Sequence, residues 1–272
     1  MKNLIKTAGV CAIALGGAYI LSTQGRADHP GMEALKGHYY AHRGLHDETR
    51  PENSMAAFRA ALDAGYGIEF DLHLTKDGNL AVMHDTSLKR TAGADVKITE
   101  LTTDELSSYR LGGTEETIPT FSDVLALFAG KAPLIIELKA DGNNFKALVD
   151  TAVKQLEGYE GPYCMESFDP RVVFVLQRYY PHIIRGQLTE DYFQVDNALP
   201  WALKWALKNQ ALNFLTKPDF VAYNTKHRNN LGNRLVRSFW GVHGVTWTVR
   251  DKDDFHDAVA DGWIPIFEGF TP

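Results

Sequence analysis

The stretch Tyr66–Asp85, with the sequence YGIEFDLHLTKDGNLAVMHD, carries the clearest pattern in the chain. Apolar and polar residues alternate over residues 68–74, which predicts a β-strand because successive side chains of a strand point to opposite faces. The polar face of this strand consists of Glu69, Asp71 and His73. Two carboxylates and a histidine on one face indicate either half of a site for a hard metal ion or the solvated face of an edge strand.

A tight turn and a second strand complete this hairpin. The turn contains Asp77-Gly78, a pair that favours a tight turn because glycine readily adopts the positive φ that the turn requires. The second strand, predicted at residues 80–83, returns His84 and Asp85 to the side of the first strand. We expect His84 to act as an acid/base group next to the acidic face, with Asp85 either orienting its ring or capping the loop.

Length and composition predict one large globular domain. The chain has 272 residues, of which 44% are hydrophobic and 23% are charged, and α/β barrels of about 250 residues form a single domain. A net charge of -6 and the lack of a dense basic cluster in the sequence argue against a nucleic-acid partner. The two cysteines, Cys11 and Cys164, are too few for a disulfide framework.

The first 27 residues have the composition of a membrane-targeting segment. Lys2 and Lys6 precede residues 7–21, which carry no charge and are rich in Ala, Gly, Ile and Leu. Counted from Leu4, the run reaches 18 residues with one lysine near its start, which is just long enough to span a bilayer. Cleavage after Ala27 is disfavoured because an arginine precedes it, so we favour an uncleaved single-pass anchor with the catalytic domain outside the cytoplasmic membrane. The alternatives are secretion after signal cleavage and a buried helix of a soluble protein.

Residues 28–37 are predicted to be a tether, and residues 38–272 repeat a pattern of apolar strand, polar loop and helix. Eight parallel strands are expected at residues 39–42, 68–74, 134–138, 163–167, 183–188, 220–224, 245–249 and 264–267. Helices are expected at residues 54–64, 145–156, 170–179, 199–215, 230–239 and 253–261, and a long irregular insertion at residues 92–120 with a short helix near residues 103–109. Eight strand–helix units in this length predict a (β/α)8 TIM barrel rather than an open sheet.

The polar residues at the ends of the predicted strands form one chemically coherent set. A TIM barrel has its active site at the carboxyl ends of its strands, so these residues should meet. Carboxylate oxygens suit Mg²⁺ or Ca²⁺, arginine and lysine suit phosphoryl oxygens, and histidines suit proton transfer near neutral pH. The set therefore predicts metal-assisted cleavage of a phosphodiester; it consists of His42, Arg43, Glu69, Asp71, His84, Glu137, Lys139, Glu166, Trp247 and Glu268.

Eight motifs in this order resemble the glycerophosphodiester phosphodiesterase family. They are His42-Arg43-Gly44, Pro51-Glu52-Asn53-Ser54, Glu69-Phe70-Asp71, Thr75-Lys76-Asp77-Gly78, His84-Asp85, Glu137-Leu138-Lys139, Ser167-Phe168-Asp169-Pro170 and Trp247-Thr248-Val249. The resemblance implies a TIM barrel that needs a divalent cation and cleaves glycerophosphodiesters to an alcohol and glycerol 3-phosphate. It also implies that His42 and His84 are the acid/base pair and that the cation is held by three carboxylates, Glu69, Asp71 and Glu137.

Four further residues complete the site that the resemblance implies. Arg43 and Lys139 are expected to bind the phosphate, and Glu52 to orient the first loop or to lie close to the metal. Trp247 either contacts the substrate or fills the barrel.

Two positions depart from the family pattern. Glu268 stands where many members have the aspartate of a Thr-Asp-Pro motif, and its longer side chain leaves its role open. Arg250 stands where asparagine is common, which could alter the substrate end of the pocket.

The sequence leaves several alternatives open. The nucleophile is either water or a hydroxyl of the substrate. The sequence predicts neither the head group of the substrate nor the oligomeric state of the protein. The alternative enzyme is a lysophospholipase D- or phospholipase C-like hydrolase of lipid phosphodiesters. The alternative of another class is an inactive barrel that serves as a surface binding protein, against which the two histidines argue because binding alone requires no acid/base pair.

The predicted helix at residues 199–215 has two apolar stripes, formed by Trp201 with Trp205 and by Leu203 with Leu207. A barrel helix needs one stripe to cover the sheet. Tryptophans next to lysines on the second stripe have the composition of a surface that meets lipid headgroups. The alternative is a break in the middle of the helix, with the tryptophans packed under a neighbouring loop.

Overall fold

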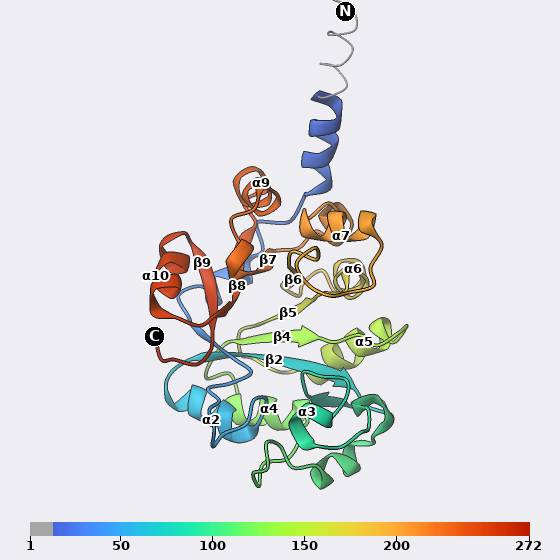
Figure 1. Cartoon of the computed structure of the whole chain (residues 1–272), viewed down its shortest axis with the longest axis vertical. Helices are drawn as coiled ribbons and strands as arrows, with labels where there is room; N and C mark the ends of the chain where they lie inside the picture. Colours follow the sequence, from blue (N-terminus) through green and yellow to red (C-terminus); the bar gives the residue numbers. More distant parts are fainter. Residues whose placement is uncertain (1–12) are drawn as a thin grey trace, which may run out of the picture.

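Eight parallel strands form a closed barrel in the computed structural model, which describes residues 13–272 (Figure 1). Strand β1 pairs with both β2 and β9, and this pairing closes the barrel. The predicted TIM barrel is therefore confirmed. Its strands are β1 (Tyr40–His42), β2 (Gly67–Leu74), β4 (Leu134–Leu138), β5 (Tyr163–Ser167), β6 (Arg185–Thr189), β7 (Phe220–Asn224), β8 (His243–Val249) and β9 (Trp263–Phe267).

A ninth strand, β3 (Leu80–Val82), pairs antiparallel with the end of β2. This is the predicted hairpin, and its turn contains Gly78 with a φ of 79°. The Thr75 hydroxyl donates to Asp77 Oδ1 over 2.6 Å and accepts from the Asn79 N–H over 2.9 Å, which fixes the turn.

Helices cover the outside of the barrel. They are α2 (Met55–Asp63), α4 (Phe121–Phe128), α5 (Phe145–Gln155), α6 (Pro170–Tyr179), α7 (Trp201–Lys208), α9 (Leu231–Trp240) and α10 (Lys252–Ala260), with two short helices, α3 (Lys89–Ala92) and α8 (Asn213–Thr216). Helix α4 is absent from the predicted pattern, although its sequence carries a start signal: Thr120 and Asp123 form a capping box at its amino terminus.

The prediction of one continuous helix over residues 199–215 is wrong. Helix α7 ends at Lys208, and Gln210 has a φ of 61°, which no continuing helix permits. The Gln210 side chain is buried and donates to Asn233 Oδ1 over 3.0 Å, so a contact with α9 stabilises the break. The two tryptophans are nevertheless on the surface, with Trp201 70% and Trp205 41% exposed.

The alternation of β2 places its apolar side chains in the outer of two apolar layers and its polar side chains, Glu69, Asp71 and His73, inside the barrel. Ile68, Phe70 and Leu72 pack under the helices in the outer layer of the core. The inner layer fills the barrel with Tyr40, Ile135, Cys164, Leu188, Phe220, Val245 and Ile266. Cys164 is buried and forms no disulfide, as expected of a small apolar residue.

The segment before β1 packs against the amino-terminal end of the barrel. Residues Pro30–Ala34 form a short 3-10 helix, η1, and its Met32 is buried together with Leu35 among the side chains of the inner layer. The Tyr40 hydroxyl donates to the Leu35 carbonyl over 2.8 Å. This part of the expected tether therefore closes one end of the barrel and leaves the carboxyl ends of the strands for the site.

The N-terminal helix, of which residues 13–22 are described, projects from the barrel next to α7 and α9 (Figure 1). The Tyr19 ring lies 5.7 Å from that of Trp205, and its hydroxyl donates to the Asn209 carbonyl. Trp240 of α9 donates to the Ile20 carbonyl over 3.1 Å. The base of this helix is thus fastened to the barrel by specific contacts.

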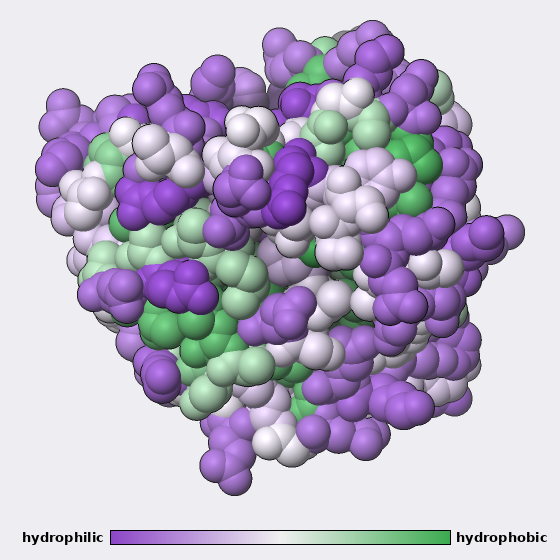
Figure 2. Space-filling model, turned by 90° about the horizontal axis from the view of Figure 1, so that it is seen from below, coloured by the Kyte–Doolittle hydropathy of each residue, from purple (hydrophilic) through white to green (hydrophobic). Residues whose placement is uncertain are grey.

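Exposed apolar side chains gather around this helix. They include Ile13, Leu15, Leu21, Trp201, Trp205, Phe214, Leu215, Leu231 and Phe239. Between Tyr39 and Phe174, a stretch that the structure describes throughout, no large hydrophobic side chain is exposed. Figure 2 shows the opposite end of the molecule, which is mainly hydrophilic apart from an apolar area on one side.

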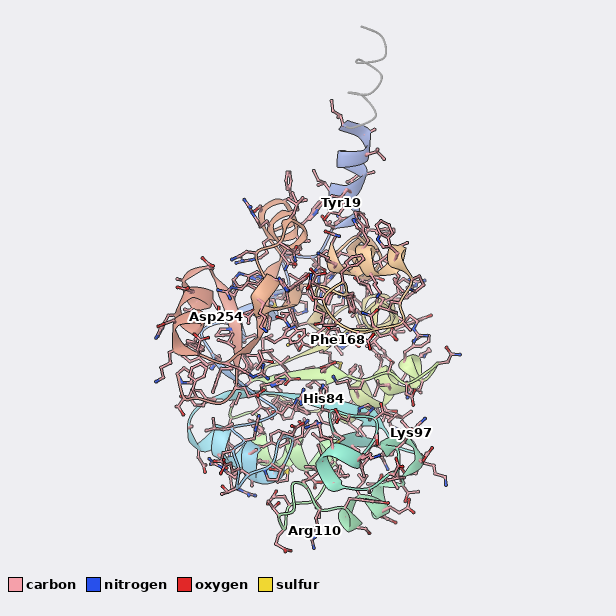
Figure 3. All side chains as sticks on the ribbon, viewed as in Figure 1. Tyr19, His84, Lys97, Arg110, Phe168 and Asp254 are labelled. Carbon is pink, nitrogen blue, oxygen red and sulfur yellow. The ribbon has the colours of Figure 1, made fainter. Side chains whose placement is uncertain are left out.

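The insertion after β3 has a small core of its own. It contains the short 3-10 helices η2 (Ile98–Glu100) and η3 (Thr103–Ser108), the latter close to the predicted helix. In Figure 3, Arg110 of this insertion lies at the lower end of the view and Lys97 at its right-hand side, both away from His84 at the centre. Its buried residues are Met83, Leu88, Ile98, Leu101, Leu106, Leu111 and Ile118.

Within residues 13–272, no helix combines the length and the apolar character needed to cross a bilayer. The first part of the expected anchor, with Lys2, Lys6 and Cys11, lies outside the described residues.

We expect Met32→Ala to lower the free energy of unfolding by about 2–5 kcal/mol, because it leaves a cavity beneath the barrel. Chemical denaturation followed by circular dichroism measures this change. Leu231→Ala, at a position that is 62% exposed, is the control and should change the free energy by about 0.5 kcal/mol or less. Similar small effects of both substitutions would show that η1 contributes no packing energy.

Candidate active site

Three carboxylates meet inside the barrel, on the polar face of β2 and at the end of β4. The register pairs Asp71 with Glu137, so both side chains point inward at one level. Oxygens of Glu69, Asp71 and Glu137 lie within 4.8 Å of one another. These residues are only 3%, 1% and 6% exposed, so the interpretation of this face as a solvated edge strand is wrong.

This carboxylate cluster carries more negative charge than its surroundings balance. Burial raises the pKa of Glu69 well above its ordinary value, and Asp71 and Glu137 raise it further. Burial also raises the pKa of Glu137, although Lys139 opposes this. The pKa of Asp71 is lowered, because Lys139, His84 and Arg43 outweigh the effect of burial. A set of three oxygen donors with this charge fits a hard divalent cation such as Mg²⁺ or Ca²⁺, which would keep all three ionised.

Each of the two predicted catalytic histidines pairs its Nδ1 atom with a carboxylate. His42, at the end of β1, pairs with Glu268 Oε2, and His84, after β3, pairs with Asp85 Oδ1 over 2.6 Å. Burial lowers the pKa of both imidazoles, although both carboxylates oppose this. A carboxylate at Nδ1 fixes the orientation of a ring and leaves Nε2 for the reaction. His42 Nε2 lies 3.8 Å from Glu69 Oε2, so this atom faces the carboxylate cluster.

The two predicted phosphate-binding cations border the same cluster. Lys139 Nζ lies 2.8 Å from Glu137 Oε1 and 3.1 Å from Asp71 Oδ1. Arg43 donates to Glu52 Oε1 over 2.8 Å, and its Nε lies 3.6 Å from Asp71 Oδ2. Glu52 thus orients Arg43 on the first loop, which is one of the two roles expected for it.

Arg90 links the loops that carry the two histidines. It donates to Glu52 Oε1 over 2.7 Å and to Asp85 Oδ2 over 2.6 Å. Sequence reasoning missed this residue because it lies in the insertion, outside every motif. Its spacing of five residues from Asp85, on a short helix, gives a weak signal at most.

Three other polar residues lie around the cluster, and the sequence predicted their contacts with it only in part or not at all. Asn53 donates from its side chain to Asp71 Oδ2 over 2.8 Å, while the neighbouring Ser54 caps α2. His73 is buried and its Nε2 lies 3.1 Å from the His84 carbonyl, which holds the loop of that histidine. Glu166 is buried beside the cluster, and its Oε2 has no hydrogen-bond partner among the described residues.

A small cavity of about 40 Å³ lies between the histidines and the carboxylates. Trp247 lines it together with Phe168, and their rings meet edge to face with centroids 5.4 Å apart. In Figure 3, Phe168 and His84 lie close to each other near the centre of the barrel. The structure therefore brings together all nine residues predicted for the site, with Trp247 as a wall of the cavity.

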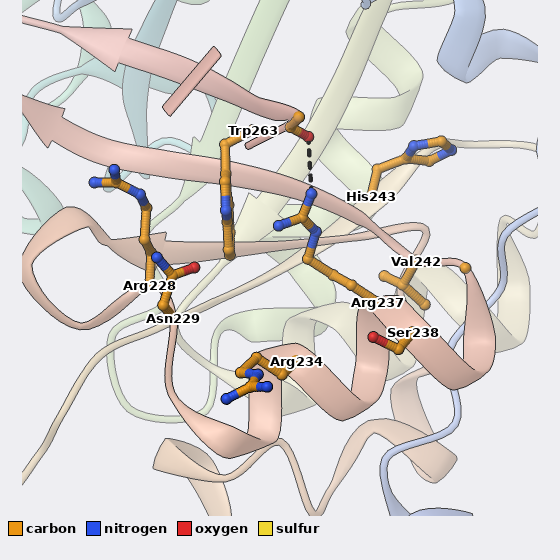
Figure 4. A pocket seen from close by; sticks show the side chains of 10 residues that line it. Arg228, Asn229, Arg234, Arg237, Ser238, Val242, His243 and Trp263 are labelled. Carbon is orange, nitrogen blue, oxygen red and sulfur yellow. Dashed lines mark hydrogen bonds between the residues drawn. The ribbon is translucent and has the colours of Figure 1, made fainter. Parts of the chain in front are cut away.

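A separate cavity of about 420 Å³ lies between α9, β8 and β9 and contains none of these nine residues (Figure 4). Its basic side chains are largely engaged in structural contacts. Arg237 stacks on Trp263, 4.4 Å from the ring centroid, and donates to the Gly262 carbonyl over 3.0 Å. Arg228 donates to Thr225 Oγ1 and pairs with Asp254.

A parallel barrel with buried carboxylates, carboxylate-paired histidines and two cations at the carboxyl ends of its strands is the arrangement of a hydrolase of phosphate esters. A model of the Glycerophosphoryl diester phosphodiesterase family matches residues 42–268. The chain belongs to this family, and it is accordingly a phosphoric diester hydrolase.

Similarity to individual proteins supports the assignment to this family. The chain is 28% identical over 235 residues to a glycerophosphodiester phosphodiesterase from Caldanaerobacter subterraneus subsp. tengcongensis, covering 82% of this chain and 89% of the relative. It is 35% identical over 164 residues to one from Bacillus altitudinis, covering 56% of this chain and 66% of the relative. Its fold is similar to that of an Oleispira antarctica phosphodiesterase solved in complex with the product sn-glycerol-3-phosphate, with a TM-score of 0.71, 21% identity and coverage of 87% and 94%.

Replacing Glu268 should change how His42 titrates. The carboxylate opposes the effect of burial on the pKa of His42, so Glu268→Gln should lower this pKa further and move the limb of the pH–kcat/KM profile that reports His42 to lower pH. This is the acidic limb if His42 accepts the proton and the alkaline limb if it donates one. We also expect kcat to fall by about 10²-fold or more, because the ring loses the partner that orients it.

The profile is measured with glycerophosphocholine over a pH series. Glu115→Gln, which removes an exposed carboxylate in the insertion, is the matched control and should leave both quantities unchanged. A loss of rate without movement of the limb would assign Glu268 a purely structural role.

Proposed function

We propose that the protein hydrolyses glycerophosphodiesters to an alcohol and glycerol 3-phosphate, using a divalent cation held by Glu69, Asp71 and Glu137. The observation that carries this proposal is the meeting of three buried carboxylates with two histidines, each of which has its own carboxylate partner. The Oleispira antarctica structure, which holds sn-glycerol-3-phosphate, supports the choice of product.

The cation supplies, when bound, the positive charge that stabilises the phosphoryl oxygens in the transition state. Arg43 and Lys139 border the carboxylates and would hold the remaining phosphoryl oxygens, the first through a planar fork and the second as a point charge. Their present carboxylate partners keep both cations in place before the substrate arrives.

The two histidines move the protons. One accepts a proton from the nucleophile, and the other gives a proton to the oxygen of the leaving alcohol. In the net reaction one water is consumed: its oxygen becomes bonded to phosphorus, the phosphorus–oxygen bond to the alcohol breaks, and one of its protons ends on the alcohol oxygen. Burial favours the neutral imidazole on which the accepting histidine depends.

Hydrolysis of glycerophosphocholine tests the proposal directly. We expect release of choline and glycerol 3-phosphate, loss of activity after exhaustive chelation, and recovery when Mg²⁺ or Ca²⁺ is added. Glu69→Ala should reduce turnover by orders of magnitude in a folded protein, because it removes a ligand of the cation.

Asp123→Ala, which alters a surface cap on α4, is the control for the loss of a carboxylate. Full activity of the chelated enzyme would contradict the metal assignment, and no hydrolysis under any metal condition would contradict the proposed substrate.

We also propose that the N-terminal segment holds the enzyme on the outer face of the cytoplasmic membrane. The uncharged run over residues 7–21, preceded by two lysines, supports this location. Ile13 and Leu15 in the described part of the helix are 78% and 72% exposed, and exposed apolar residues of α7 and α9 surround its base. A bilayer would cover these side chains together.

Fractionation of cells that produce the full chain tests this location. We expect the protein in the membrane fraction, resistant to high salt, and digested by protease added to spheroplasts. Ile13→Asp combined with Leu15→Asp should release it, whereas Asp28→Asn should not. Recovery in the cytosol, or only as a processed soluble form, would contradict the anchor.

A further inference from the structure

The cavity of about 420 Å³ between α9, β8 and β9 lies apart from the catalytic site. Gly241, Val242 and His243, which line it, precede or begin β8, and Gly262 and Trp263 precede or begin β9. These are the amino-terminal ends of two barrel strands, whereas the catalytic residues lie at the carboxyl ends. The volume lies within the range of about 300–1,000 Å³ that is typical of small-molecule sites.

The wall of this cavity is basic. Three arginines line it, Arg228, Arg234 and Arg237, and none of the described residues that line it is an aspartate or a glutamate. These arginines belong to a stretch, residues 220–250, that carries no acidic residue although the whole chain has a net charge of -6. The cavity thus concentrates positive charge in an otherwise acidic protein, which favours an anionic ligand.

Structural contacts engage these arginines without neutralising two of them. Arg237 donates to two backbone carbonyls over 2.8 and 3.0 Å, and neither contact cancels its charge. Arg234 is exposed, and its side chain forms no hydrogen bond or ion pair with the residues that the structure describes. Arg228 pairs with one carboxylate, yet its buried Nε has no partner among residues 13–272. The wall therefore holds more cationic donors than the acceptors around it satisfy.

Arg237 is held in place before any ligand arrives. Its guanidinium stacks on the Trp263 indole, and Figure 4 shows it between Trp263 and His243. The indole is itself fixed, because it lies against Gly244 of the paired strand, where a Cβ would come within 2.5 Å of the ring. A planar guanidinium fixed in this way suits the oxygens of a phosphate group, since little side-chain entropy remains to be lost on binding.

Arg234 shares one face of α9 with an exposed apolar residue. Leu231, Arg234 and Ser238 follow one another at spacings of three and four residues, which places them on the same side of the helix. Leu231 is 62% exposed, and Ser238 is exposed where it lines the cavity. Trp240, at the end of α9, donates to the Ile20 carbonyl of the N-terminal helix. With the proposed location, a phosphate at Arg234 is accessible both from water and from a bilayer.

We propose that this cavity binds the phosphate group of an anionic ligand, either a soluble phosphomonoester or the headgroup of an anionic phospholipid. Arg234 and Arg237 supply the positive charge, and the remaining volume accommodates the organic group that the phosphate carries. Binding at this cavity does not depend on hydrolysis at the catalytic site, so each can fail without the other.

Modification of Arg234 by phenylglyoxal, a reagent specific for arginine, measures occupancy of the cavity. The full chain is placed in vesicles of phosphatidylcholine alone, in vesicles that also contain phosphatidylglycerol, and in phosphatidylcholine vesicles with glycerol 3-phosphate in solution. Peptide mass spectrometry gives the modification rate of each arginine, so a ligand at the catalytic site does not affect the result for Arg234. We expect Arg234 to react about 10-fold more slowly at a ligand concentration of about ten times Kd. Arg59, exposed on α2, is the internal control and should react at one rate throughout.

Two substitutions of Ser238 separate binding in the cavity from adsorption of a charged vesicle to α9. Ser238→Asp places a carboxylate in the cavity and should weaken the protection of Arg234 by about 10-fold or more, because like charges repel. Ser238→Asn, which has a similar size and no charge, is the matched control and should preserve the protection.

The two ligand sources give different outcomes. Protection of Arg234 by phosphatidylglycerol alone assigns a lipid headgroup to the cavity, and protection by glycerol 3-phosphate assigns a soluble phosphomonoester; either result supports the site. An unchanged rate with both ligands, or protection that persists undiminished in Ser238→Asp, would overturn the proposal.

Discussion

The burial of three carboxylates within 4.8 Å of one another is the constraint on which the rest of the site depends. Buried like charges repel, and the interior of the barrel screens them poorly. Lys139, Arg43 and Asn53 stabilise Asp71 in its ionised form, while the raised pKa of Glu69 shows that this compensation is incomplete. A divalent cation is the ligand that such a cluster favours, and the same positive charge is what a phosphodiester needs in order to react.

The ends of the strands around this cluster position the two histidines. Pairing of β1 with β9 places Glu268 beside His42, and the hairpin of β2 with β3 places Asp85 and His84 on the other side. Arg90 then joins the two loops through Glu52 and Asp85. The acid/base pair is therefore positioned by two independent carboxylates and by one arginine that bridges their loops.

The parts of the fold that depend on local pattern could be predicted from the sequence, and those that depend on closure of the barrel could not. The alternation of β2 and its Asp-Gly turn predict the hairpin and place Glu69 and Asp71 on one face of the strand. By contrast, the contact between His42 and Glu268 joins residues 226 positions apart and exists because β9 returns to β1. The end of α7 likewise depends on a contact between Gln210 and α9, which outweighs the helical preference of the following residues.

Helix α7 connects two properties that the sequence shows only as two apolar stripes. One stripe lines a groove that His84 and Trp247 also border, and the other is exposed beside the N-terminal helix, where Trp205 contacts Tyr19. A helix that only covered a barrel would bury one stripe and expose charged residues on the other. If the bilayer covers the exposed stripe, the groove lies one helix diameter, about 10 Å, from the lipid surface. The proposed membrane location therefore accounts for the exposed stripe of α7, which packing on the barrel alone does not require.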